Sequence, residues 1–177
     1  MSTNTRIDEL KSALAQRILV MDGAMGTAIQ NKDLVPEDFG GEEYEGCNEC
    51  LISTRPDVIE DIHRSYLQAG ADIIETGTFG ATPVVLAEYD LAHEARRINR
   101  EGAAIALKVA MEESTPEKPR YIAGSMGPTT KTISVTGGIT FEELANDYHI
   151  QAVGLIEGGV DLLLLETSQD TLNVKAG

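Results

Sequence analysis

Two stretches of the chain repeat one order of residues, and this repeat restricts the fold more than any other feature. Residues 68–76 read QAGADIIET and residues 157–167 read EGGVDLLLLET, so each passes from a helix end through glycine and aspartate into an apolar run that ends on Glu-Thr. The four leucines after Asp161 form a continuous apolar run, which is typical of a strand buried on both faces of a parallel sheet. Such repeats predict an α/β fold, either a (β/α)8 barrel or a doubly wound sheet.

Short apolar runs and amphipathic stretches alternate along the whole chain. Strands are predicted at residues 18–21, 72–75, 120–124 and 161–165. Helices are predicted at residues 6–15, 56–69 and 92–113, from Thr140 onward, and from Leu172 onward. Thr54 is the predicted N-cap of the second helix, and Thr140 with Glu143 has the pattern of a capping box.

Four βα units amount to about half of a (β/α)8 barrel, which typically needs about 250 residues. We therefore expect residues 1–177 to form a single domain made of parallel βα repeats, about half of a TIM-type barrel. A half-barrel leaves parallel edge strands unpaired. The chain is expected to be the front half of a larger barrel, or a piece that associates with the remaining half or with a second copy of itself.

The net charge of −15, from 29 acidic and 14 basic residues, limits the partners of the chain. Nucleic acid and anionic membrane surfaces would be repelled, so we expect neither as a partner. No apolar run approaches the roughly 20 residues that a membrane-spanning helix needs. The first residues lack the apolar segment of a secretory signal, and a cytoplasmic location is the expectation.

Polar side chains gather at the carboxyl ends of the predicted strands, where α/β enzymes build their sites. These residues are Asp22, Glu75-Thr76, Ser125 and Glu166-Thr167. Carboxylates on several strands suit a small polar substrate with a positive group. Glu166 ends the most apolar strand, where a carboxylate is costly to desolvate unless a cation or donors meet it. Glu75 holds the equivalent place on its strand, and spacing alone does not assign a role to both.

The stretch MDGAMGT, residues 21–27, is the sharpest local motif. Gly23 and Gly26 permit a tight turn with free backbone N–H groups, which could bind an anion such as a carboxylate. A plain strand-to-loop turn explains the glycines equally well. The phosphate-binding spacings of glycine are absent. Asp72 and Asp161 stand at the opposite ends of their strands and are expected to cap turns.

The three histidines, His63, His93 and His149, have no metal-binding spacing. They are expected to be surface or half-buried helix residues. The acidic segment 37–49 is expected to be a solvated excursion of the chain.

Cys47 and Cys50 are the only cysteines and have the C-x-x-C spacing. A structural zinc site needs a second ligand pair, which the sequence lacks. A redox dithiol would lie directly between a strand and a helix, whereas about 25 residues separate the first predicted strand from Cys47. The sequence therefore disfavours both a metal and a redox role for this pair.

Four blocks together resemble a known family. They are RILVMDGAMGTAIQ (17–30), EGCNECLISTRPDVIEDIHRSYLQAGADIIETGTFGAT (45–82), TPEKPRYIAGSMGPTTKT (115–132) and GGVDLLLLETSQDTLNVKAG (158–177). In this order they are similar to the amino-terminal half of the homocysteine-binding module of cobalamin-dependent methionine synthases. The resemblance covers essentially the whole chain and implies a (β/α)8 barrel.

The resemblance implies a substrate site for homocysteine. By position, Asp22 and Glu166 would hold the amino group, and the backbone at Gly23 and Ala24 would receive the carboxylate. Thr78 belongs to the same substrate-binding set. The family binds the homocysteine sulfur to zinc as a thiolate, which takes a methyl group from methylcobalamin.

The resemblance places the zinc-ligand cysteines outside these 177 residues. It therefore implies no catalytic or metal-binding residue here, no cofactor bound to this chain, and an isolated chain without activity. Gly77 and Cys50 depart from the family pattern, because Gly77 stands where the family has asparagine. Two other functions stay open: a self-associating half-barrel without chemistry, and half of a homocysteine methyltransferase that uses another methyl donor.

Overall fold

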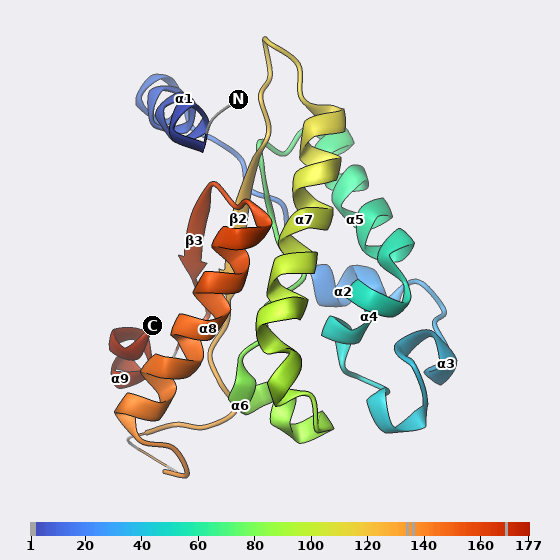
Figure 1. Cartoon of the computed structure of the whole chain (residues 1–177). Coiled ribbons are helices and arrows are strands. Elements are labelled where there is room, and N and C mark those ends of the chain that lie inside the picture. The colour runs from blue at the N-terminus through green and yellow to red at the C-terminus, as the bar shows by residue number, and fades with distance from the viewer. Residues whose placement is uncertain (1–2, 134, 136, 169) are drawn as a thin grey trace.

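A parallel three-stranded sheet lies at the centre of the molecule (Figure 1). The computed structural model describes residues 3–133, 135, 137–168 and 170–177. The sheet has the order β1 (Ile73–Glu75), β2 (Tyr121–Met126) and β3 (Leu162–Leu165), with Ile73 opposite Tyr121 and Ala123 opposite Leu162. The prediction of parallel βα repeats is therefore confirmed.

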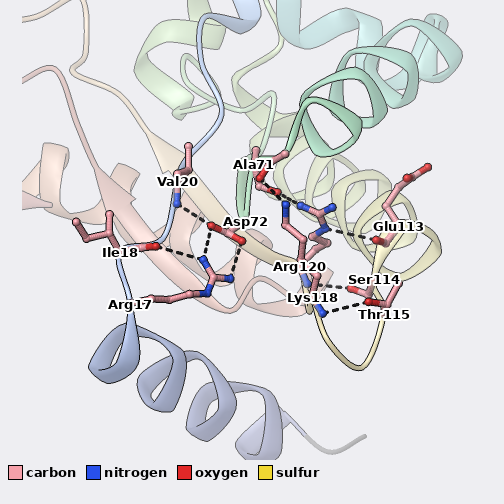
Figure 2. Close-up of polar contacts among 11 residues, drawn as sticks. Arg17, Ile18, Val20, Ala71, Asp72, Glu113, Ser114, Thr115, Lys118 and Arg120 are labelled. Carbon is pink, nitrogen blue, oxygen red and sulfur yellow. Dashed lines mark hydrogen bonds and ion pairs between the residues drawn. The ribbon is translucent and has the colours of Figure 1, made fainter.

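The predicted strand at residues 18–21 forms only a single parallel bridge, between Met21 and Ile73. The Asp72 side chain accounts for the difference, because it accepts hydrogen bonds from the Val20 amide at 2.9 Å and from the Arg17 guanidinium (Figure 2). The Val20 amide, which could serve a strand ladder, is thus taken by a side chain. Ile18, the first residue of the predicted strand, is 88% exposed and so is not part of the core.

Three long helices cover one face of the sheet (Figure 1): α5 (Pro56–Ala69), α7 (Ala95–Glu113) and α8 (Phe141–Gly158). Gly158 lets α8 approach α7 closely, since a Cβ atom there would lie 2.4 Å from the Arg100 carbonyl oxygen. The remaining α-helices are α1 (Thr3–Gln16), α2 (Met25–Gln30), α3 (Pro36–Phe39), α4 (Leu51–Thr54), α6 (Pro83–Leu86) and α9 (Thr171–Ala176). Short 3₁₀ turns are η1 (Glu42–Tyr44), η2 (Asn48–Cys50), η3 (Ala87–Tyr89) and η4 (Ala92–Glu94).

The two faces of the sheet are apolar but have different neighbours. Ile74 and Ile122 belong to the core under the long helices, together with Leu67 and Leu155. Ile73, Tyr121 and Ala123 face the other way and pack with Leu10 of α1, next to the partly buried Leu162 and Leu164. Because side chains alternate along a strand, residues 75, 125 and 166 continue this second face toward the carboxyl end of the sheet.

The predicted helices have mostly the expected bounds. The helix at 56–69 is confirmed, and so is the capping box, in which the Glu143 amide donates to Thr140 Oγ1 at 3.2 Å. The predicted cap of α5 is wrong, because the Thr54 hydroxyl donates instead to the Cys50 carbonyl and Arg55 occupies the cap position. The helix expected at 92–113 begins at Ala95, after the η4 turn.

Two expectations about exposure need correction. The segment 37–49 is only partly solvated: Glu42, Glu43 and Glu45 are exposed, whereas Phe39 and Cys47 insert into two apolar clusters. His63 is fully buried because it lies on the same stripe of α5 as Ile59 and Leu67. Neither ring nitrogen of His63 has a partner among the described residues, and burial lowers the pKa of this imidazole to about 4. Among the described helices, none has both the length and the apolar character to cross a membrane.

Candidate substrate site

A cavity of about 460 Å³ opens at the carboxyl ends of the strands. Its walls come from the loop after the Met21 bridge, from η2, and from the residues that follow β1 and β3. The lining residues are Asp22, Gly23, Ala24, Met25, Gly26, Asn48, Glu49, Glu75, Thr76, Gly77, Phe79, Ser125 and Glu166. Four of the five predicted substrate-binding residues are in this set.

Asp22 is fixed by the strand next to it. Its Oδ1 atom accepts a hydrogen bond from the Glu75 amide at 3.0 Å, while the Asp22 amide donates to the Ile73 carbonyl at 2.9 Å. Burial raises the pKa of the Asp22 carboxyl to about 7, and the nearby Glu75 and Glu166 carboxylates add to this shift. The carboxylate is therefore held in place and easily protonated when no cation is near it.

Glu75 and Glu166 enter the cavity from β1 and from the end of β3. Burial, together with the adjacent Glu166 carboxylate, raises the pKa of Glu75 to about 7. Glu166 Oε1 accepts a hydrogen bond from Ser125 Oγ at 2.5 Å. The described lining residues include no lysine or arginine. With Glu49 the lining has four carboxyl groups, and this many acids without a lysine or arginine in the described lining favour a ligand that brings a positive charge.

The turn at Gly23 and Ala24 supplies backbone groups on the same wall. The residues precede α2, which begins at Met25, so the expected tight turn continues as a short helix. Within the described part of the chain, the amides of Gly23 and Ala24 donate no hydrogen bond. Two free amides next to two carboxylates can bind the anionic and cationic groups of one amino acid.

Thr78 lies behind the cavity wall and is not one of the lining residues. Its side chain is fully buried and donates to the Ser125 carbonyl at 2.9 Å, and its Oγ1 lies 2.6 Å from Thr76 Oγ1. The side-chain Nε2 of Gln151 in α8 donates a hydrogen bond to the Thr78 carbonyl at 2.8 Å. Thr78 therefore supports the loop that carries Gly77 and Phe79 into the cavity.

Several lining residues were not predicted, above all Glu49 and Phe79. Glu49 Oε1 accepts a hydrogen bond from the Gly80 amide at 2.8 Å, and burial raises the pKa of Glu49. The Phe79 ring packs over Gly127, where a Cβ atom would lie 2.8 Å from the ring. No strand-end pattern marks Glu49, because it comes from the segment that the sequence suggested was solvated.

The two cysteine side chains do not line this cavity, although the residues between them do. Cys47 and Cys50 are buried free thiols in the apolar cluster formed with Ile52 and Leu86. In the described part of the chain, no group of three or more histidine, cysteine, aspartate or glutamate side chains is arranged to hold a metal ion. These side chains do not fit the family's zinc site, and we assign no zinc-dependent step to them.

Comparison with known proteins defines the class. The profile of the homocysteine S-methyltransferase family matches residues 19–177. The chain is 47% identical over 168 residues to the methionine synthases of Mycobacterium leprae and Mycobacterium tuberculosis, covering 95% of this chain. The chain belongs to the homocysteine S-methyltransferase family. It spans only 14% of the length of these relatives.

Solved structures agree on the fold. The metallated form of the homocysteine methyltransferase MmuM from Escherichia coli superposes with a TM-score of 0.76 at 22% identity. The match covers 94% of this chain and 60% of MmuM. The oxidised form of MmuM superposes with a TM-score of 0.77. At this level of identity the likeness shows a shared fold, and the chain corresponds to a little over half of that structure.

Proposed function

We propose that this chain is the homocysteine-binding part of a methionine synthase or a related homocysteine S-methyltransferase. The observation that carries the proposal is the meeting of Asp22 and Glu166, 144 positions apart in the sequence, in one cavity beside the free amides of Gly23 and Ala24. The family match over residues 19–177 supports the same function.

In this proposal the ammonium group of homocysteine lies between Asp22 and Glu166. Its charge replaces the missing protein cation and returns Asp22 to the ionised state. The carboxylate accepts hydrogen bonds from the amides of Gly23 and Ala24, and the methylene groups lie along Phe79 and Met25. Thr78 contributes by supporting the loop from behind.

The sulfur chemistry needs groups outside these 177 residues. In the full enzyme, zinc would hold the sulfur as a thiolate, and methylcobalamin would supply the methyl group. We propose that the third possibility, half of a homocysteine methyltransferase with a different methyl donor, would use the same amino-acid site. We propose that the isolated chain binds the amino acid and transfers no methyl group.

The open edge of the sheet suggests that another structural unit pairs with it. Within the described residues no strand pairs with the outer edge of β3, where Leu163 is 41% exposed. An unpaired parallel edge favours the addition of further strands. We propose that the remaining βα units of the barrel cover it, with a second copy of the chain as the alternative. Sedimentation of the purified chain separates these, because a concentration-independent monomer contradicts pairing of two copies.

Calorimetry with L-homocysteine tests the site. Asp22→Asn and Glu166→Gln each keep an oxygen acceptor but remove a charge, so each should weaken binding about tenfold or more. Asp61→Asn, at a carboxylate whose side chain is 69% exposed, is the matched control and should change nothing. Binding that is unaffected by both site changes would contradict the proposal. Zinc-dependent methylation of homocysteine by the chain alone would contradict the expected inactivity.

The pH dependence of binding gives an independent check. Asp22 has a pKa of about 7 in the free chain and must be ionised to hold the ammonium group. Affinity should therefore increase as the pH rises from 6 to 8, with a proton released on binding. An affinity that is constant over this range would show that Asp22 does not contact the ammonium.

A further inference from the structure

Cys47 and Cys50 lie next to each other in the η2 turn. The Cys50 amide donates to the Cys47 carbonyl at 3.0 Å, and residues 48–50 form a 3₁₀ turn. A turn closed by such a bond brings the Cα atoms of its first and fourth residues to within about 7 Å, a separation that a disulfide can bridge. Both thiols are free and belong to one apolar cluster. The pair is thus arranged for an intramolecular disulfide with little movement of the backbone.

The two thiols differ in access and acidity. Cys50 lines a separate pocket of about 200 Å³, together with Phe39, Tyr44 and Leu91, whereas Cys47 is only 1% exposed and is not in that lining. The neighbouring Cys47 thiol lowers the pKa of the Cys50 thiol, whereas Cys50 and burial raise the pKa of Cys47. A small reagent would therefore meet Cys50 first, and as the more reactive thiolate.

The turn that holds the thiols also forms a wall of the substrate cavity. Asn48 and Glu49, the two residues between the cysteines, both line that cavity. Cys47 Sγ lies 4.0 Å from Glu49 Oε2, and Glu49 Oε1 accepts the hydrogen bond from the Gly80 amide. Gly80 directly follows Phe79 on the opposite wall. Glu49 therefore connects the thiols to two parts of the cavity wall, the η2 turn and the loop that carries Phe79.

We propose that Cys47 and Cys50 form a redox-modification site, which a low-molecular-weight disulfide oxidises and which adjusts the substrate cavity through Glu49. The Cys50 thiolate attacks the small disulfide, forms a mixed disulfide and releases one thiolate. Cys47 then loses its proton to Glu49, attacks the Cys50 sulfur and releases the second thiolate. The balance is two protein thiols oxidised to one disulfide and one small disulfide reduced to two thiols.

Mass spectrometry of the 177-residue chain treated with glutathione disulfide tests whether Cys47 and Cys50 form a disulfide. The wild-type chain should become lighter by two hydrogen atoms and carry no glutathione. Cys47→Ala should keep one glutathione, attached to Cys50, because no second thiol can release it. Cys50→Ala should remain unmodified. A wild-type chain that keeps its reduced mass, or a Cys50→Ala chain modified as fast as Cys47→Ala, would overturn the site.

Hydrogen exchange tests the coupling and needs no ligand, so it stands apart from the proposed homocysteine binding. Oxidation moves Glu49, and the Gly80 amide loses a charged acceptor. Its exchange should become about tenfold faster or more, as expected for a lost hydrogen bond to a carboxylate. The exchange of α8 amides in the same sample is the control and should not change. An unchanged Gly80 amide in a fully oxidised chain would overturn the coupling.

Discussion

The acidic residues at the two ends of the same strands differ in whether they have a basic partner. At the amino ends, Asp72 is paired with Arg17 through bonds of 2.7 and 2.8 Å, and Asp161 is paired with Arg6 at the same two distances (Figure 2 shows the first pair). At the carboxyl ends, Glu75 and Glu166 share a cavity whose described lining has no basic residue. The repeat Asp-apolar-Glu-Thr thus places one acid at each end of a strand, and only the first acid has a protein cation.

The difference separates structural acids from acids available to a ligand. The Arg17 guanidinium lowers the pKa of Asp72 to about 2, so this carboxylate stays ionised and holds the segment after α1 against the sheet. Burial and neighbouring acids raise the pKa of Glu75 to about 7. Acids that pair with a protein cation stabilise the fold. Acids without such a partner in a cavity mark a site where a positively charged ligand can bind.

The largest expected effect is at the amino end. Asp161→Ala removes a side chain that is 2% exposed, leaves Arg6 without its partner and frees the Ile122 amide. The free energy of unfolding should fall by about 3 kcal/mol, because breaking a partly buried pair leaves an uncompensated charge. Urea unfolding measures it. Asp57→Ala breaks the exposed pair with Arg55 and removes an acid from the first turn of α5, so it should cost less than about 1 kcal/mol. Equal effects at the two positions would contradict the distinction between the buried pairs at the strand ends and surface pairs.

A stabilising change is expected at the carboxyl end. The pKa of Asp22 is about 7 in the folded chain and 3.8 as its ordinary value. Between these values the folded state holds a proton that the unfolded state has lost, so stability falls as the pH rises. Asp22→Asn should therefore stabilise the chain by about 2 kcal/mol at pH 8, allowing for solvent screening, and by almost nothing at pH 4.

The matched variant for this test is Asp72→Asn. The Arg17 guanidinium lowers the pKa of Asp72, so the ionised form contributes stability that is present above the ordinary pKa and lost as the pH falls toward 2. Thermal unfolding across pH should show a loss of stability at pH 8 for Asp72→Asn and a gain for Asp22→Asn. Two variants with the same sign at pH 8 would show that the ends of the strands do not differ in this way.

The smallest expected effect concerns Ser125, which donates to Glu166. Such a hydrogen bond contributes about 1 kcal/mol, so Ser125→Ala should weaken homocysteine binding about fivefold. Calorimetry measures this change, and Ser53→Ala, an exposed hydroxyl on α4, is the control. If Ser125→Ala leaves the affinity unchanged, Glu166 does not depend on this donor for its orientation.

Much of the fold followed from local pattern. The strands at 73–75, 121–126 and 162–165 lie within one or two residues of the predicted bounds, and α5 matches residue for residue. These elements are fixed by apolar periodicity and by proline, glycine and capping residues within a few positions of one another. The failure at the first strand involves a distant partner: the bridge at Met21 replaced a strand because Asp72 binds the Val20 amide. The failed cap at Thr54 is local, because its hydroxyl donates to the Cys50 carbonyl.

By itself, the sequence determined the βα repeat, the acids at both ends of its strands, and much of the cavity wall. Only the tertiary structure decided which acids have partners, since Arg6 and Arg17 meet aspartates 155 and 55 positions away. It also decided that the Cys47–Cys50 turn packs beside the cavity, with Glu49 against Gly80. Periodicity encodes which side of an element is apolar, whereas the charge around a buried group is set by residues that only folding brings near.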